Sequence, residues 1–148
     1  MTDDKDIDAI TEQIVDAAVK IHIKLGPGLL ESVYEAVLVR EVERRGLGVE
    51  QQKPISFEFD GMRFEEGFRA DLLVDGCVIV ELKSVEKMAP VHSKQLLTYL
   101  RLLHLPVGLL INFGESRLKD GLHRIANNYQ PSFSAPPRLR VNQKKHPP

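Results

Sequence analysis

Charged side chains stand inside a stretch of sequence that otherwise looks like buried strand, from Phe68 to Lys83. Burying a charge is costly unless the charge is paired or binds a metal. Successive strand residues point to opposite faces, so Glu81 and Lys83 share one face, about 7 Å apart along the strand. The same stretch also carries Asp71. These three side chains are therefore the first candidates for a chemical site.

The turn between the two strands decides whether Asp71 joins the other two residues. A two-residue loop at the turn signal Asp75-Gly76 would put Asp71 on the face opposite to Glu81. A three-residue loop that begins one residue earlier would pair Leu73 with Cys77, and Asp71 would then lie diagonal to Glu81 on one face. The residues permit either register, and a shared site requires the second.

Two carboxylates on one face suit a hard divalent cation such as Mg²⁺ or Mn²⁺, which prefers oxygen ligands. The backbone carbonyl of Leu82 could supply a third oxygen. Lys83 could orient or help deprotonate the attacking water and offset the charge that builds up on a phosphate. The alternative is an ordinary Glu–Lys pair on a solvent-facing strand, and for Glu81-Leu-Lys83 alone this alternative is the commoner one.

Polar residues on two predicted helices could add to this cluster. Glu31 and Tyr34 are three residues apart on one helical face, and the helix dipole favours a carboxylate in a first turn. The dipole alone would also explain Glu31, with Tyr34 packing on the core. Gln95 and Tyr99 are four residues apart on a later helix. They could reach the cluster or a phosphate, or form a half-exposed polar edge.

The charge of the whole chain gives no general attraction to nucleic acid. Lys and Arg number 20 against 21 Asp and Glu, so any attraction must come from local charges. Arg69, on the strand face of Asp71, and Lys87, soon after Lys83, are candidates for contacts with a nucleic-acid backbone. Either could equally be surface charge.

The elements that must position these residues follow from periodicity. Apolar residues recur at helical spacing over residues 8–24 and 29–45, with Gly26-Pro27-Gly28 between them. Between Ile55 and Lys83 the period is two, and the turn signals Asp60-Gly61 and Asp75-Gly76 predict three strands joined by hairpins. A helix over 91–103, a buried strand over 107–113 and a short helix over 118–127 follow. This order predicts an α/β fold in which helices cover a mixed sheet.

Length and composition predict one domain, over residues 1–129. Residues 130–148 are rich in proline and basic residues and poor in large apolar ones, so we expect a flexible tail. The tail could touch phosphates or have no role. The single cysteine, Cys77, lies in an apolar run and fits a reducing cytoplasm. We expect neither export nor membrane insertion, because no apolar segment is long and uninterrupted.

Four motifs occur in a fixed order along the chain: Gly28-Leu-Leu-Glu31-Ser-Val-Tyr34, Arg69-Ala-Asp71, Glu81-Leu-Lys83 and Gln95-Leu-Leu-Thr-Tyr99. In this they resemble the GxxExxY protein family, a branch of the PD-(D/E)XK nuclease superfamily. The resemblance covers about residues 10–127 and is specific because several separated motifs keep the family's order. It implies a restriction-endonuclease-like αβββαβ core, a mixed sheet flanked by helices.

The resemblance also implies roles for the site residues. Asp71 and Glu81 would be the metal carboxylates, Lys83 the catalytic lysine, and Glu31 a helix-borne acid that completes the metal shell. The superfamily's Pro-Asp is Ala70-Asp71 here, and only the Asp side chain has a chemical task. The expected function is Mg²⁺- or Mn²⁺-dependent hydrolysis of phosphodiester bonds by a metal-activated water, in DNA in preference to RNA.

An alternative from another class is a non-catalytic nucleic-acid-binding or accessory module that retains the nuclease fold. The near-neutral charge and small size favour it, because a lone domain without a basic face would hold duplex DNA poorly. Homodimerisation could supply the additional contacts with DNA. Metal binding without cleavage would favour the accessory module.

Overall fold

The computed structural model describes residues 6–129. The predicted tail, residues 130–148, lies outside the described residues. Within the described range the elements are α1 (Ile7–Leu25), α2 (Glu31–Arg44), β1 (Val49–Phe59), β2 (Met62–Val74), β3 (Val78–Lys83), α3 (Pro90–Leu103), β4 (Val107–Asn112), the short 3-10 helix η2 (Leu118–Gly121) and β5 (Leu122–Ala126). Over these same residues, no helix has the length and apolar character needed to cross a membrane.

The first two helices form where the apolar periodicity predicted them, with bounds that differ by at most two residues. The apolar positions of α1 face the sheet, and Ile14 and Ala18 have no exposed surface. Asp6 caps the first turn of α1, because its side chain accepts a hydrogen bond from the N–H of Ala9 at 3.1 Å. The helix ends at Gly26, and a short turn leads into α2.

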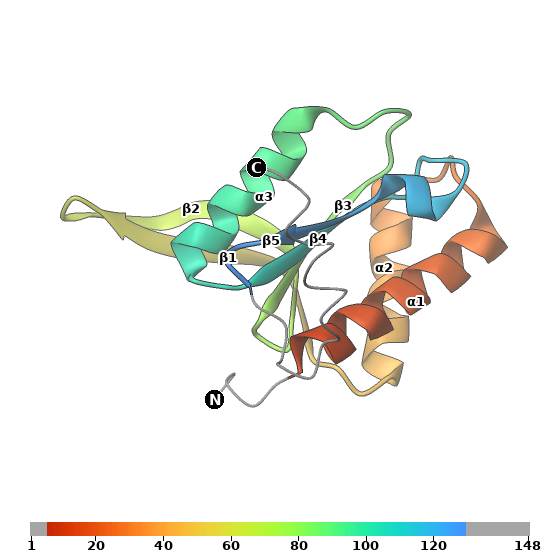
Figure 1. The fold of residues 1–148 in the computed structure, drawn as a ribbon, viewed down its shortest axis with the longest axis horizontal. Coiled ribbons are helices and arrows are strands. Elements are labelled where there is room, and N and C mark those ends of the chain that lie inside the picture. The colour runs from red at the N-terminus through yellow and green to blue at the C-terminus, as the bar shows by residue number, and fades with distance from the viewer. Residues whose placement is uncertain (1–5, 130–148) are drawn as a thin grey trace, which may run out of the picture.

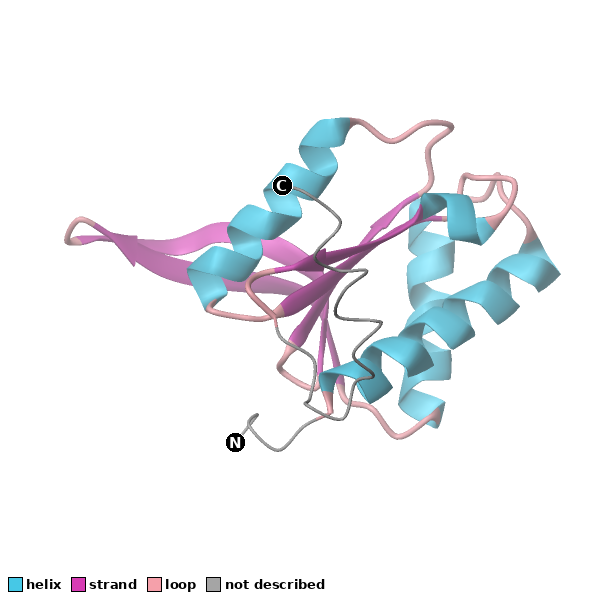
Figure 2. Cartoon of the chain, viewed as in Figure 1, coloured by secondary structure: helices cyan, strands magenta, loops and turns pink. Residues whose placement is uncertain are grey.

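The strands form one mixed sheet in the order β1-β2-β3-β4-β5. Neighbouring strands are antiparallel except β3 and β4, which run parallel and are connected through α3. Helices α1 and α2 pack on one face of the sheet and α3 on the other (Figures 1 and 2). Along β3, Val80 and Leu82 therefore point toward α1 and α2, whereas Ile79 points toward α3. The predicted α/β fold with an αβββαβ core is confirmed.

The hairpin of β1 and β2 is longer than predicted and leaves the body of the sheet. β1 begins at Val49, before the predicted start at Ile55. β3 pairs with β2 only from Leu72 to Val74. The part of the hairpin around the Asp60-Gly61 turn therefore has no third strand beside it, and it projects as a two-stranded arm (Figure 1).

The predicted helix over residues 118–127 is wrong. After the short η2 turn the chain forms β5, which pairs antiparallel with β4 from Ile111 opposite Leu122 to Val107 opposite Ala126. Leucine and isoleucine spacing fits a helix here, but every residue of β4 is buried. Without β5, one edge of β4 would leave its backbone N–H and C=O groups unpaired. Pairing this edge outweighs the weak helix preference of about ten residues.

Candidate active site

The candidate site lies where β2 and β3 separate. Their regular pairing ends at Leu72 opposite Val80. Beyond this pair, backbone N–H groups donate to side-chain carboxylates instead of to the carbonyls of the neighbouring strand. The N–H of Asp71 donates to Glu81 Oε2 at 3.0 Å, and the N–H of Leu82 donates to Asp71 Oδ2 at 2.8 Å. The two carboxylates therefore face each other across the gap between the strands.

The turn that sets this register differs from both predicted alternatives. Asp75 and Gly76 have positive φ, and the N–H of Cys77 donates to the carbonyl of Val74 at 3.0 Å. Val74 nevertheless pairs with Val78, so the loop consists of residues 75–77 and not 74–76. The expected pairing of Leu73 with Cys77 is wrong. Compared with the two-residue loop Asp75-Gly76, the loop has one extra residue, Cys77. This residue shifts the pairing of β3 with β2 by one position, and a shift of one position exchanges the two faces of a strand. Leu72 and Val80 are the last pair of this register, and the two hydrogen bonds described above bring the carboxylates of Asp71 and Glu81 together beyond it.

The backbone of β3 adds an oxygen to the same gap. In a strand, the N–H and C=O of one residue point to the same neighbour. The N–H of Leu82 points toward Asp71, whereas the carbonyl of Lys83 accepts from the N–H of Phe113 on the β4 side at 2.8 Å. The carbonyl of Leu82 is therefore directed toward the β2 side, where Asp71 lies.

Burial shifts the acid–base behaviour of both carboxyl groups. Burial, reinforced by the negative charge of Asp71, raises the pKa of Glu81 to about 8. Burial also raises the pKa of Asp71, although the hydrogen bond from Leu82 acts in the opposite direction. The positive charge of Lys83 favours the ionised form of both groups. The protein thus holds two carboxyl groups that are costly to ionise together, a cost that a bound cation would remove.

Glu31 is the first residue of α2 and is held by the turn that precedes it. The hydroxyl of Tyr34 donates to the carbonyl of Gly26 at 2.5 Å and accepts from the N–H of Leu29 at 3.1 Å. Tyr34 has no exposed surface, and its ring stacks on Phe113 with centroids 4.5 Å apart. In this structure Tyr34 supports the turn before Glu31 and offers no surface to a substrate.

Contacts from the end of β3 bring this turn to the strand carboxylates. The hydroxyl of Ser84 donates to the carbonyl of Leu29 at 2.6 Å. Glu31 consequently lies within electrostatic reach of the cluster. Burial and the charge of Asp71 raise the pKa of Glu31, and Lys83 acts in the opposite direction. Ser84 is a positioning residue that the sequence motifs did not single out.

The loop after Ser84 is held by Asn112, which is fully buried at the end of β4. Its amide nitrogen donates to the carbonyl of Val85 at 2.9 Å, and its amide oxygen accepts from the N–H groups of Val85 at 3.0 Å and Gly114 at 2.9 Å. A side chain at Gly114 would meet this loop, because a Cβ there would lie 2.1 Å from the carbonyl oxygen of Val85. In the sequence, the asparagine within an otherwise apolar strand could have indicated this role.

Two further residues join the acidic cluster from α2 and β1. Glu35, only 8% exposed, accepts hydrogen bonds from the amide of Gln52 at 3.0 and 3.2 Å and from Gln51 at 3.2 Å. The same Gln52 amide donates to Asp71 Oδ1 at 3.4 Å. Gln52 has a φ of 48°, a left-handed conformation that is costly for a residue with a side chain in a strand. Glu35 follows Glu31 by one helical turn, and this spacing could have indicated that it lies near the site. Nothing in the sequence indicates that Gln52 does.

The remaining candidates differ in how closely they are linked to the cluster. Arg69 is exposed, forms an ion pair with Glu66 and donates to the carbonyl of Gln52 at 3.4 Å. Tyr99 stacks on Phe68 with centroids 3.9 Å apart. Burial and the charges of Glu81 and Asp71 raise the pKa of Tyr99. Two exposed candidates make no hydrogen bond to the acidic cluster within residues 6–129, namely Lys87 and Gln95.

Sequence comparison shows which family the chain belongs to. Residues 8–125 match the family model of the PD-(D/E)XK nuclease superfamily. The chain belongs to this superfamily. A search of solved structures finds one titled "Crystal structure of SSO0001", with a TM-score of 0.41 and 16% sequence identity, covering 82% of this chain and 79% of that one. No curated protein matches the chain.

The residues that resemble the PD-(D/E)XK signature lie at the gap between β2 and β3. Asp71 is the candidate for the first acid, and Glu81-Leu-Lys83 holds the candidates for the second acid and the lysine. Ala70 stands where the signature has proline. Ala70 is fully buried on the α3 side of the sheet, so the departure concerns packing and leaves the Asp71 carboxylate in the gap.

The donor set of this candidate site fits a small divalent cation. Within residues 6–129, no three His, Cys, Asp or Glu side chains are arranged to hold a metal ion by themselves. The place of Glu31 in the metal shell, which the resemblance implies, stays a prediction. Asp71, Glu81 and the Leu82 carbonyl still offer three oxygens. Mg²⁺ commonly takes one or two carboxylates and keeps several waters.

Proposed function

We propose that this protein is a divalent-metal-dependent nuclease that hydrolyses phosphodiester bonds, with DNA as the preferred substrate over RNA. The observation that carries the proposal is the pair of carboxylates of Asp71 and Glu81 facing each other across the gap between β2 and β3. Lys83 follows two residues later, and its charge acts on both. An acid pair and an amine in this relation are the groups that phosphodiester hydrolysis requires.

Mg²⁺ or Mn²⁺ would be held by Asp71, Glu81 and the carbonyl of Leu82, with waters in the remaining positions. When bound, such a cation supplies charge stabilisation at the phosphate and lowers the pKa of water. Glu31, at the start of α2, would then orient the water shell on the open side. This role needs no direct bond from Glu31 and agrees with its electrostatic coupling to Asp71.

The protein's own groups divide the remaining work. Lys83 would hold the attacking water by hydrogen bonding and offset the negative charge that grows on the phosphate oxygens. Water adds to phosphorus as the bond to the leaving oxygen breaks, and a proton passes to that oxygen. Glu35 and Gln52 would keep the Asp71 carboxylate in one orientation, since Gln52 bridges the two acids. The proposed substrate contacts are Arg69, Lys87, Gln95 and Tyr99.

A cleavage assay beside calorimetry tests the proposal with substitutions at three positions. Asp71→Asn and Glu81→Gln should lose both Mn²⁺ binding and cleavage of labelled DNA. Lys83→Met should keep Mn²⁺ binding and lose cleavage by about 10²-fold or more, because the lysine acts on the phosphate and not on the ion. Glu43→Gln, at an exposed position of α2, is the matched control and should behave as the wild type. Cleavage that survives Lys83→Met and Glu81→Gln would rule the proposal out.

The accessory module remains a second candidate because of one surface feature. A pocket beside the site is lined by Ser84, by residues without charge, and by two carboxylates, Glu31 and Glu86, with no basic side chain. Such a wall repels phosphates. Mn²⁺ binding by the wild type without cutting of single- or double-stranded DNA or RNA would favour this candidate.

A further inference from the structure

A groove of about 660 Å³ runs between α1 and α2. A short turn joins the end of α1 to the start of α2, so the two helices form an antiparallel hairpin. Residues between 17 and 25 of α1 line one side of the groove, and residues between 36 and 44 of α2 line the other. At a rise of about 1.5 Å per residue, the groove is about 12 Å long, which is enough for two turns of a further helix.

The floor of this groove is apolar and recessed. Ala17 and Ile21 line it although only 0% and 7% of their surface is exposed, whereas Leu25 and Val37 are 43% and 37% exposed. Ala36 adds a second small side chain, so the backbone of a ligand can come close to the helices. Contact with the floor therefore requires a ligand that enters the groove.

The two rims of the groove are basic. Lys20 and Lys24 are one turn apart on α1, and Arg40 and Arg44 are one turn apart on α2. Each helix thus lines its own side of the groove with two cations. Against these four cations the lining has one carboxylate, on Glu41, which gives a formal net charge of +3.

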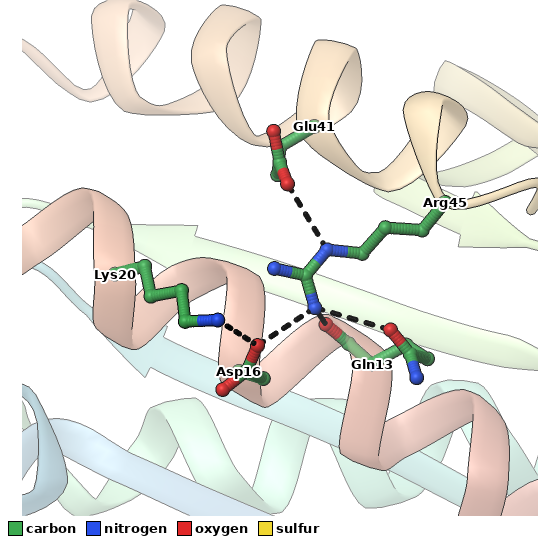
Figure 3. Close-up of polar contacts among 5 residues, drawn as sticks. All are labelled: Gln13, Asp16, Lys20, Glu41 and Arg45. Carbon is green, nitrogen blue, oxygen red and sulfur yellow. Dashed lines mark hydrogen bonds and ion pairs between the residues drawn. The ribbon is translucent and has the colours of Figure 1, made fainter.

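The acids near the groove are already paired within the helix hairpin (Figure 3). Arg45, at the end of α2, donates to Asp16 Oδ2 at 2.9 Å and to Glu41 Oε2 at 3.1 Å. Lys20 pairs with the same Asp16 at 3.1 Å. The cations of the groove that form no ion pair within residues 6–129 are Lys24, Arg40 and Arg44. An acidic ligand would supply their missing partners.

The combination of floor and rims selects one kind of ligand. An amphipathic helix with a stripe of apolar side chains between two rows of carboxylates matches both. Nucleic acid could pair its phosphates with the rims, but it has no apolar ridge to fill the floor. An anionic membrane is flat and would not reach Ala17 and Ile21, which are recessed. A third helix against two is also the packing of an ordinary helical bundle.

We propose that the α1–α2 groove is the docking site for an acidic amphipathic helix of a partner protein. About two turns of this helix lie in the groove, with apolar side chains on the floor and carboxylates paired with the cations of both rims. The contacts of Arg45 already tie α2 to α1, so docking needs little rearrangement. The groove includes none of Asp71, Glu81 and Lys83, so the proposal does not depend on the nuclease site.

Two labelled helical peptides of identical composition test the proposal by fluorescence anisotropy with the full chain. Both are designed as heptads with leucine at positions a and d. The first has glutamate at e and g, beside the leucine stripe. The second has glutamate at b and c, on the outer side, so its net charge is the same. The wild type should bind the first peptide at least tenfold more tightly than the second, because only the first can reach floor and rims together.

Charge reversal on one rim tests the basic residues. Arg40→Glu with Arg44→Glu should weaken binding of the first peptide by tenfold or more, which corresponds to about 1.4 kcal/mol or more. Both positions are exposed, so the fold should survive. Lys94→Glu with Arg101→Glu, at exposed positions of α3, makes an equal charge change elsewhere and should bind as the wild type does.

A substitution in the apolar part of the lining tests the apolar contact separately from charge. Val37→Ser should weaken binding by about fivefold, because two methyl groups leave the groove. Val91→Ser, at an exposed position of α3, is the matched control and should have no effect. Equal binding of the two peptides by the wild type, or unchanged binding by the groove variants, would overturn the proposal.

The other possible occupants give distinct results in the same experiments. Groove variants that lose binding to DNA oligonucleotides or to phosphatidylserine vesicles, while the wild type binds neither peptide, would make the groove a surface for phosphates. A wild-type dimer that Arg40→Glu with Arg44→Glu dissociates in sedimentation equilibrium would make a second copy the occupant. Either result would overturn the proposal of a partner helix.

Discussion

Glu81→Gln should stabilise the metal-free protein while it removes the proposed activity. The wild-type carboxyl group sits where burial and Asp71 raise its pKa to about 8, against an ordinary value of 4.5. At neutral pH, folding must therefore either take up a proton or bury a charge. Glutamine has the same shape, carries no charge, and can accept the same hydrogen bond from the N–H of Asp71, which is 3.0 Å long in the wild type.

The sign and size of this stability difference follow from the linkage between proton binding and folding. A carboxyl group whose pKa is raised by folding binds more protons in the folded state, so wild-type stability falls as pH rises from 4.5 toward 8. The penalty is about 1 kcal/mol at pH 5 and about 4 kcal/mol at pH 8. Glu81→Gln does not carry this penalty at either pH. The stability difference between variant and wild type should therefore widen with pH.

Urea denaturation with a chelator present measures this difference. At pH 8 we expect Glu81→Gln to exceed the wild type by several kcal/mol, and at pH 5 by about 1 kcal/mol or less. Glu43→Gln, on an exposed helix position, should follow the wild type at both values. Mn²⁺ should reverse the order, because it stabilises only a folded protein that binds it. A variant that is less stable than the wild type at pH 8 without metal would refute the reasoning.

Substitutions at three further positions test the residues that position the site. Tyr34→Phe removes a hydroxyl that bonds to two partly buried backbone groups, and should lower the free energy of unfolding by about 0.5–1.5 kcal/mol in urea titration. Gln52→Ala and Gln52→Gly should both reduce cleavage, yet the glycine variant should be the more stable by about 1 kcal/mol, since φ of 48° suits glycine; equal stability would argue against a strained backbone. Gly114→Ala should displace the loop at Val85 and weaken Mn²⁺ affinity measured by calorimetry, because the added Cβ overlaps a backbone oxygen.

Much of the fold could be predicted from local patterns. The helices α1, α2 and α3 follow from apolar spacing and stop signals, and β4 from its continuous apolar run. The segment over residues 118–127 could not be predicted this way. Its spacing fits a helix, and only the unpaired edge of β4 makes it a strand. That edge is supplied by residues that precede it in the chain, so no local window contains the deciding interaction.

For the site, the sequence by itself determined which chemical groups are available. Asp71, Glu81 and Lys83 stand in strands, and their order among the other motifs marks the superfamily. Only the tertiary structure decided how they meet. The loop of residues 75–77 sets the register of β2 and β3 up to Leu72 opposite Val80, and Gln52 links Asp71 to Glu35 from another element. Register depends on one backbone turn, and convergence depends on packing between distant segments. Neither leaves a periodic trace in the sequence.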